Sequence, residues 1–289
     1  YDFNDVINEL VKLIISFTPV AVFCILAKTF STQGIETIMP LAGYFFTVVW
    51  TLPFMYFFFK KNLKWSENPK LQILRGMTLL SANICFFYSI SVISMAKALT
   101  LAFIAPLVTT ALSPIFLGEN VGIKRWSAVI VGFIGSLIVI RPGLIEFNIA
   151  TVAALGTGFF YGVYLIITRK LHTVDNPLLT LLITGVVGAI ISSLFVPIVW
   201  VNLSQSQWLW LALMGIFACL GHLLLIYSLR YADASKLAPF GYFEIITNII
   251  LGYYFFKDFP DVWTFTGLFI IISSGVYVFR KEYKNIQNI

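Results

Sequence analysis

The chain has 289 residues, of which 59% are hydrophobic and 11% are charged, and its mean hydropathy is +0.91. An average soluble domain is about 45–50% apolar and about 25% charged, so this composition excludes a soluble globular enzyme and a disordered chain. The net charge of +6 does not indicate a nucleic-acid-binding protein, because the basic residues lie between apolar runs and form no stripe.

Ten apolar runs follow one another along the chain, most of them about as long as a helix that crosses a bilayer. Backbone groups in lipid must be satisfied internally, so these runs are predicted to be helices. In chain order they are Val11–Thr29, Thr37–Phe59, Leu71–Val92, Ala98–Leu117, Trp126–Ile140, Ile149–Thr168, Leu178–Trp200, Trp208–Leu229, Leu237–Phe256 and Trp263–Phe279. The fifth run is short and is expected to extend into its flanks. The predicted fold is an all-α integral membrane protein with ten transmembrane helices.

The basic residues between the runs predict how the helices are oriented. With the N-terminus inside, 15 of the 19 Lys and Arg residues fall on the inner side, and Lys28, Lys97, Arg141 and Lys257 fall outside. Cytoplasmic loops carry an excess of Lys and Arg. This distribution predicts a multi-pass protein of the bacterial inner membrane with both termini in the cytoplasm.

The second half of the sequence repeats features of the first half at a shift of 139 residues. The shift aligns Tyr88 with Tyr227, Lys97 with Lys236, Leu112 with Leu251, Glu119 with Asp258 and Arg141 with Arg280. We therefore predict two five-helix repeats, residues 1–145 and 146–289, with opposite orientation in the membrane. Inverted repeats are typical of secondary transporters that work by alternating access, with the substrate site near the midplane.

Several motifs resemble one transporter family. They are Leu74–Gly76 at the start of the third run, Thr110–Asn120, the pair Arg125–Trp126 that follows it, and Val131–Gly135. Together they resemble the EamA domain of the drug/metabolite transporter superfamily, as two units that cover essentially the whole chain. The second unit departs from the pattern, because Lys257–Asp258 stands where the first unit has Gly118–Glu119.

The resemblance implies a small organic substrate. Ala238–Glu244 is similar to the branch that contains bacterial S-adenosylmethionine carriers, whereas the block from Leu112 to Glu119 equally resembles riboflavin carriers. A cationic, zwitterionic or aromatic metabolite, such as S-adenosylmethionine or an amino-acid derivative, is therefore the expected substrate. The alternative is riboflavin or another neutral aromatic metabolite, with Glu244 in a structural role.

Glu244 is the acidic residue that lies deepest in a predicted span, about seven residues into the ninth. The other charges are placed at span ends, where they set orientation. A charge at the bilayer centre costs about 2.5–3.5 kcal/mol on insertion scales. We therefore predict that Glu244 binds the substrate or couples transport to protons. The alternative is a protonated carboxyl group that forms a structural hydrogen bond to a neighbouring helix.

Other polar residues are predicted to line the same cavity. His222 and Asn83 occupy equivalent midplane positions under the 139-residue shift, and Asn248 lies one helical turn after Glu244. Tyr161 and Tyr88 present aromatic faces that suit an organic cation. For His222 and Asn83 the alternative role is an interhelical hydrogen bond, and for each tyrosine it is packing.

Two lysines and two prolines indicate how the cavity opens. Lys97 and Lys236 begin the fourth and ninth runs at opposite mouths, as gate residues or as side chains that extend to the interface. Pro106 and Pro114 lie within the fourth run, where a proline can break the helix and release backbone carbonyls.

No cofactor, metal site or catalytic activity is predicted. Cys24, Cys85 and Cys219 lie within apolar runs and lack metal-ligand spacing, and the loops carry no nucleotide-binding motif. Transport is then expected to use a gradient, with proton coupling as one option, or exchange. The expected partners are a small-molecule substrate and the lipid bilayer, with no nucleic acid, in a monomer or homodimer. Two functions of a different class stay open, a lipid-modifying membrane enzyme and a receptor that does not transport.

Overall fold

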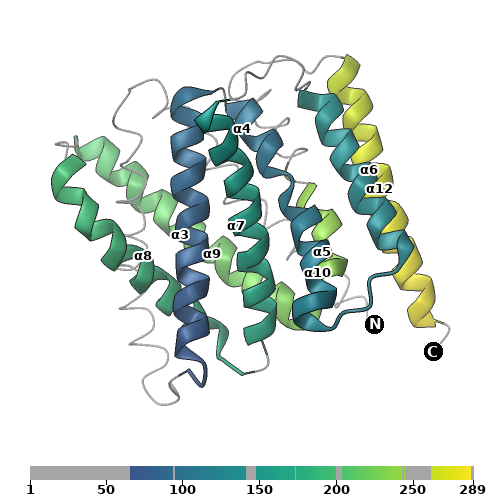
Figure 1. The fold of residues 1–289 in the computed structure, drawn as a ribbon, viewed down its shortest axis with the longest axis horizontal. Helices are drawn as coiled ribbons and strands as arrows, with labels where there is room; N and C mark the ends of the chain where they lie inside the picture. The colour runs from purple at the N-terminus through teal and green to yellow at the C-terminus, as the bar shows by residue number, and fades with distance from the viewer. Residues whose placement is uncertain are drawn as a thin grey trace. The chain divides into compact units, whose positions relative to one another are not determined.

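The computed structural model describes residues 66–93, 95–140, 148–172, 174–199, 204–242, 244 and 262–287. The first two predicted spans and Asn248 lie outside these ranges. The helices are α3 (Pro69–Val92), α4 (Met95–Ala102), α5 (Ala105–Leu117), α6 (Ile123–Ile140), α7 (Ile149–Leu171), α8 (Pro177–Val199), α9 (Gln205–Tyr231), α10 (Ala234–Leu237), the 3₁₀ helix η3 (Ala238–Tyr242) and α12 (Val262–Gln287) (Figure 1).

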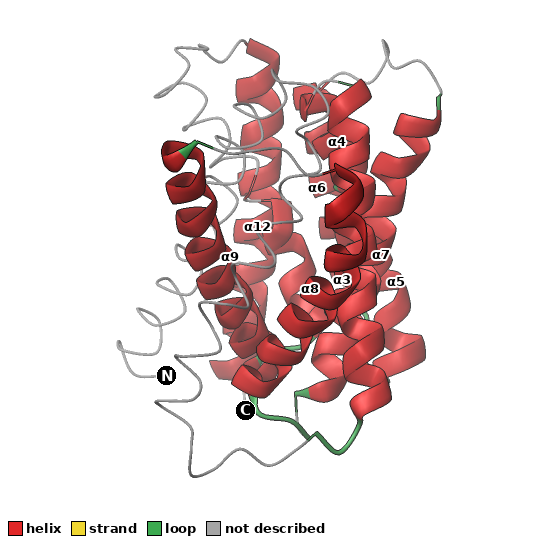
Figure 2. Ribbon diagram, turned by 90° about the vertical axis from the view of Figure 1, so that its left-hand side faces the viewer, coloured by secondary structure: helices red, strands yellow, loops and turns green. Residues whose placement is uncertain are grey.

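The described part of the chain is helical throughout, and Figure 2 shows helices and loops without a strand in it. By length and composition, two helices among the described residues, α3 and α7, are able to cross a membrane. The all-α, apolar character predicted from the sequence is therefore confirmed. Helix α6 begins three residues before the predicted fifth run, as expected for a run that was too short.

The fourth predicted span is two helices. Helix α4 ends at Ala102 and α5 begins at Ala105, with a turn at Phe103 and Ile104 between them. Pro106 accounts for this break, because it has no N–H to donate to the carbonyl of Ala102 one turn earlier. Pro114 lies inside α5 without ending it, and the carbonyl of Thr110 accepts a hydrogen bond from the Ser113 hydroxyl instead (3.2 Å).

The ninth predicted span also differs from one continuous helix. Its first residue, Leu237, ends the four-residue helix α10 (Ala234–Leu237), the next five residues form the 3₁₀ helix η3, and Glu244 is again in α-helix. Helix boundaries recur 139 residues apart. α3 and α9 end at Val92 and Tyr231, α4 and α10 begin at Met95 and Ala234, and α6 and α12 begin at Ile123 and Val262.

The chain divides into two compact units. Unit 1 comprises Tyr1–Leu80 and Ile167–Tyr231, and unit 2 comprises Ser81–Ile166 and Ala232–Ile289. Each unit combines segments from both predicted repeats. The predicted repeats at residues 1–145 and 146–289 are defined by sequence similarity, whereas the two units are defined by contacts in space. The units therefore do not test the repeats, which stay a prediction.

In unit 2, α6 and α12 lie side by side and run in opposite directions (Figure 1). The Ser274 hydroxyl donates a hydrogen bond to the Ala128 carbonyl (2.7 Å), and a β-carbon added to Gly135 would lie 3.1 Å from the Gly267 carbonyl oxygen. Beside this helix pair is a buried core of Phe103, Val129, Ala238, Tyr242 and Ile271. The two interrupted segments, α4–α5 and α10–η3, thus pack against the α6–α12 pair.

Candidate functional site

The break between α4 and α5 rests on two glycines of α7. A β-carbon added to Gly158 would lie 2.5 Å from the carbonyl oxygen of Ala102, and one added to Gly162 would lie 2.7 Å from Val108. Contacts this short are essentially never found for real β-carbons. The two glycines of α7 therefore leave space for the α4–α5 segment, and a larger residue at either position would fill that space.

Phe103, in the turn between α4 and α5, contacts Tyr242, the last residue of η3. The rings of Phe103 and Tyr242 lie 6.1 Å apart between centroids, and Tyr242 is only 1% exposed. Its ring also lies over Gly132 of α6, where an added β-carbon would be 2.5 Å from a ring carbon. Tyr242 is thus a packing residue in the buried core of unit 2.

Of the six predicted cavity residues, the four that are both described and within the ranges of unit 2 are Asn83, Tyr88, Tyr161 and Glu244. Asn83 and Tyr161 are half-buried on α3 and α7, and Glu244 is half-buried just after η3. The Tyr161 ring stacks on the ring of Tyr164, with centroids 5.6 Å apart and an interplanar angle of 20°. Tyr88 is 46% exposed. That these side chains share one cavity stays a prediction.

One predicted cavity residue, His222, belongs to unit 1, whereas the two predicted gate residues, Lys97 and Lys236, belong to unit 2. His222 is half-buried on α9. Asn248 lies outside the described residues. Lys97 lies on α4, and Lys236 pairs with Asp233 on α10 (2.9 Å).

Unit 1 contains a buried charge that the sequence places at a span end. Arg75, near the start of α3 and one of the 15 basic residues predicted on the inner side, is completely buried. Its Nε donates a hydrogen bond to the Thr168 hydroxyl (2.7 Å), and its Nη1 donates to the Thr180 carbonyl (3.1 Å) and to the Thr184 hydroxyl. A buried guanidinium needs such acceptors in place of water. Arg75 therefore joins α3 to α7 and α8.

A second buried network surrounds Asp175, in the turn between α7 and α8. Its carboxylate accepts hydrogen bonds from the Ser66 hydroxyl (2.6 Å), the Glu67 N–H (3.3 Å) and the Gln72 side-chain amide (2.7 Å). Asp175 is 7% exposed. These bonds anchor the start of α3. The sequence predicted neither the Arg75 network nor the Asp175 network. The signal that could have indicated the first is an arginine inside an apolar run.

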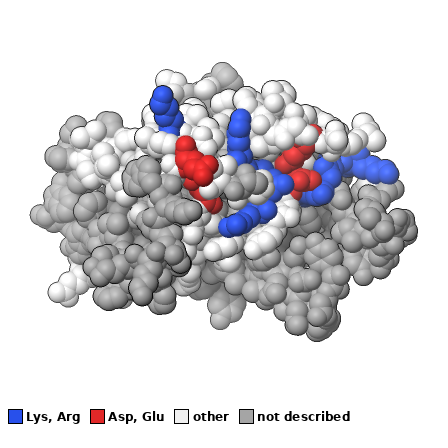
Figure 3. Space-filling model, turned by 90° about the horizontal axis from the view of Figure 1, so that it is seen from below, with Lys and Arg blue, Asp and Glu red and all other residues white. Residues whose placement is uncertain are grey.

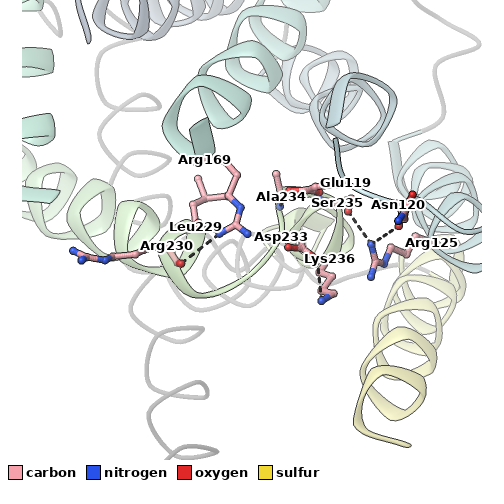
Figure 4. Close-up of polar contacts among 10 residues, drawn as sticks. All are labelled: Glu119, Asn120, Arg125, Arg169, Leu229, Arg230, Asp233, Ala234, Ser235 and Lys236. Atoms are coloured by element: carbon pink, nitrogen blue, oxygen red, sulfur yellow. Dashed lines mark hydrogen bonds and ion pairs between the residues drawn. The ribbon is translucent and has the colours of Figure 1, made fainter. Parts of the chain in front are cut away.

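The start of α10 in unit 2 is held by the turn between α5 and α6 (Figure 4). The Glu119 carboxylate accepts hydrogen bonds from the backbone N–H groups of Ala234 (2.8 Å) and Ser235 (2.9 Å). Arg125 donates to the Ser235 hydroxyl (3.1 Å) and to the Asn120 carbonyl (3.0 Å). Figure 3 shows acidic side chains next to basic ones on the surface seen from below.

Two family models match the chain. The model of the EamA-like transporter family matches residues 148–280, and that of the sodium:dicarboxylate symporter family matches residues 1–78. Most of the second stretch lies outside the described residues.

Curated relatives are transporters. The S-adenosylmethionine uptake transporter of Rickettsia conorii is 30% identical over 83% of this chain and 82% of its own length. That of Rickettsia prowazekii is 26% identical over 98% of this chain and 96% of its own, so its similarity includes most of the first 78 residues as well. The riboflavin transporter of Vibrio cholerae is 29% identical over 65% of this chain and 63% of its own.

A crystal structure of a protein 15% identical in sequence matches with a TM-score of 0.77, over 95% of this chain and 98% of the matched one. At this identity the likeness concerns the fold alone.

Proposed function

The chain belongs to the EamA-like transporter family, and we propose that its substrate is S-adenosylmethionine or a related cationic metabolite. As a member of this family it is a multi-pass membrane protein and a secondary transporter of a small organic metabolite. The observation that carries this proposal is the relationship to the Rickettsia S-adenosylmethionine uptake transporters over more than four fifths of the chain. Transport would occur across the bacterial inner membrane by alternating access, without catalysis, and with both termini in the cytoplasm.

We propose ten transmembrane helices in two inverted halves, residues 1–145 and 146–289. The helix boundaries that recur 139 residues apart support the repeat. The antiparallel pairing of α6 and α12 supports the inversion. The positions midway along this pairing are Gly132 and Ile271, which are themselves 139 residues apart.

The contact between Phe103 and Tyr242 supports the same symmetry, because these residues are also 139 apart. Where two equivalent halves are related by a two-fold axis, a residue can contact its own counterpart only next to that axis. The interrupted segments of the two halves would therefore meet at the axis. Interrupted helices at this place are typical of secondary transporters, in which they flank the substrate site.

The chemistry of the predicted cavity residues suits a sulfonium compound. S-adenosylmethionine has a positively charged sulfur, an amino-acid group and a flat adenine ring. The Glu244 carboxylate would bind the cation, with the aromatic faces of Tyr161 and Tyr88 beside it. Asn83, His222 and Asn248 would supply hydrogen bonds. Lys97 and Lys236 would lie at the two mouths.

Riboflavin is the second candidate, on the similarity to the Vibrio cholerae riboflavin transporter. Riboflavin is a neutral ring system, so its recognition would depend on stacking and hydrogen bonds. Glu244 would then have a structural role and would not distinguish charged from neutral substrates.

A ligand comparison separates the two candidates. Purified protein is melted in detergent with S-adenosylmethionine, S-adenosylhomocysteine or riboflavin. S-adenosylhomocysteine is the matched control, because it lacks the methyl group and the charge on sulfur. A ligand at 100 times its Kd stabilises the folded state by about 2.7 kcal/mol. We expect S-adenosylmethionine to raise the melting temperature most, whereas a larger shift with riboflavin would contradict the proposal.

Substitution of Glu244 tests the proposed charge recognition. We expect Glu244→Gln to fold and to lose the preference for S-adenosylmethionine over S-adenosylhomocysteine, because the amide is neutral. Glu67→Gln is the control, since Glu67 is an exposed acid outside the predicted cavity. Counterflow in liposomes measures the preference. Normal discrimination by Glu244→Gln would remove Glu244 from the substrate site.

A further inference from the structure

A groove lies on the exposed surface between α6 and α12 of unit 2, two helices that Figure 1 shows side by side. The groove has a volume of about 380 Å³. Ala128 and Ser274 are buried at its floor, whereas Phe269, which is 73% exposed, and Val131 form part of its walls. The groove is therefore accessible from the surface and suits an elongated apolar ligand.

The groove is about as long as one leaflet of a bilayer is thick. It extends along α12 from Phe269, near the middle of the tenth predicted span, to Tyr277, near the end of that span. Eight residues of α-helix rise by about 12 Å, and half of the hydrocarbon core is about 15 Å thick. Tyr277 is 48% exposed, as is typical of an aromatic residue at the membrane interface.

Two contacts define the register of the helix pair. The Ser274 hydrogen bond to the Ala128 carbonyl and the close approach of Gly135 to Gly267 place the members of each pair at the same level. In this register, Lys124 of α6 is level with the residue that follows Tyr277. Lys124 is exposed, and it precedes the groove residues Ser127 and Ala128 by one turn on the same helix face.

Basic residues continue the groove face of α12 beyond Tyr277. Arg280, Lys281 and Lys284 follow Tyr277 at intervals of three, four and seven residues, so their positions share its helix face. The one acidic residue in this stretch, Glu282, is about 140° away around the helix. The apolar groove thus leads to a basic end that both helices form.

We infer that this groove binds an anionic phospholipid, with an acyl chain between α6 and α12 and the phosphate group at the basic end. Basic pockets between membrane helices bind the head groups of anionic lipids. Ser273 is exposed in the groove about 8 Å below the level of Lys124, a depth that suits the ester group between chain and head group. The bound lipid would stabilise the helix pair against which both interrupted segments pack.

A second copy of the chain fits this surface less well than a lipid. Two copies in one membrane share one orientation, so a two-fold contact through the groove would place their basic ends at the same level. Like charges that meet at an interface oppose association. The choice of the inner leaflet rests on the proposed orientation, whereas the groove and its basic end do not depend on the orientation or on the substrate.

Native mass spectrometry of the purified protein tests the inference. The protein is freed of lipid in detergent and titrated with phosphatidylglycerol or with phosphatidylcholine of the same acyl chains. The two lipids share the phosphate, and the choline group makes the second one neutral overall. We expect the first bound phosphatidylglycerol to have a Kd at least 5-fold lower than that of phosphatidylcholine. Equal Kd values would overturn the inference.

Charge variants test the basic end. Lys124→Gln and Lys281→Gln are each expected to weaken phosphatidylglycerol binding about 5-fold, the effect of one basic residue near an anionic lipid surface, and to leave phosphatidylcholine binding unchanged. Lys70→Gln is the matched control, because Lys70 is an exposed lysine at the start of α3. An effect of Lys70→Gln equal to that of Lys124→Gln would contradict a site at this groove.

Bulky substitutions test the acyl-chain groove. Val131→Trp fills it and is expected to weaken the binding of both lipids, whereas Val152→Trp makes the same change at an exposed position of α7 and should leave binding unchanged. If Val131→Trp does not fold, Ser273→Phe fills the groove from α12. Unchanged lipid binding in the filled groove would overturn the inference, and so would a dimer that Val131→Trp dissociates without any loss of lipid.

Inorganic phosphate distinguishes a lipid from a free anion. We expect millimolar phosphate to leave phosphatidylglycerol binding within 2-fold, because the acyl chain contributes to affinity, whereas full displacement by phosphate would overturn the acyl-chain site. Lipid binding is measured without substrate. Selective phosphatidylglycerol binding without counterflow of any metabolite would support this inference and contradict the proposed function, and counterflow without lipid selectivity would do the reverse.

Discussion

Gly132 provides the sharpest stability test of the packing at the centre of unit 2. In Gly132→Ala the new β-carbon would lie 2.5 Å and 2.7 Å from two ring carbons of Tyr242, whereas an ordinary contact begins at 3.4 Å. The ring would have to move by about 0.9 Å, and it is held by Phe103 and Ile271 in a core where Tyr242 is 1% exposed. Overpacking of this kind costs about 1–3 kcal/mol of folding stability. Because the new β-carbon would conflict with two ring carbons of Tyr242, we expect a loss in the upper half of that range.

The measurement is a double-mutant cycle in thermal unfolding of the purified protein. Gly132→Ala is expected to lower the melting temperature by several degrees in the native background. In a Tyr242→Ala background the same change should cost almost nothing, because the conflicting ring atoms are absent. Gly122→Ala is the matched control just before α6, where an added β-carbon meets no atom within 4 Å. Equal losses in both backgrounds would refute the reasoning, and so would native stability of Gly132→Ala.

Substitutions at three further positions test other features of the structure. Arg75→Met should destabilise the protein by about 2–5 kcal/mol, because it leaves buried oxygens without a donor, and Arg75→Lys should recover part of the loss in chemical or thermal unfolding. Gly118→Ala should cost about 1–2 kcal/mol although its site is open, because Gly118 has a φ of 66°, and Gly118→Asn should cost less. Ser274→Ala should cost only about 0.5–1.5 kcal/mol, since one bond to Ala128 is lost. A loss for Ser274→Ala as large as that for Arg75→Met would contradict this ranking.

Local features of the sequence were enough to predict the helices. The runs that became α3, α7, α8 and α9 start and end within a few residues of the predicted bounds, because apolar length alone decides which segments can be helices in lipid. Pro106 predicted a break for an equally local reason, the absence of one N–H group. The shift of 139 residues also came from the sequence, and it reappears in the helix boundaries.

The candidate site was predictable only in part. Glu244, Asn83 and Tyr161 are proposed for the site because they are polar residues within apolar runs, a property that the sequence displays directly. The role of Glu119 was hidden, because its partners on α10 are 115 and 116 residues away. Its only local signal was the glycine before it, which permits the left-handed turn after α5.

The sequence by itself determined that the described part of the chain is helical and apolar and where most of its long helices begin, because hydropathy and proline act within a few residues. Only the tertiary structure decided that Arg75 is buried, that Tyr242 packs on Gly132, and that Glu119 caps α10. Each of these depends on a partner about 90 to 116 residues away. The free energy of burying a charge or of capping a helix is set by that partner and not by the neighbours in sequence.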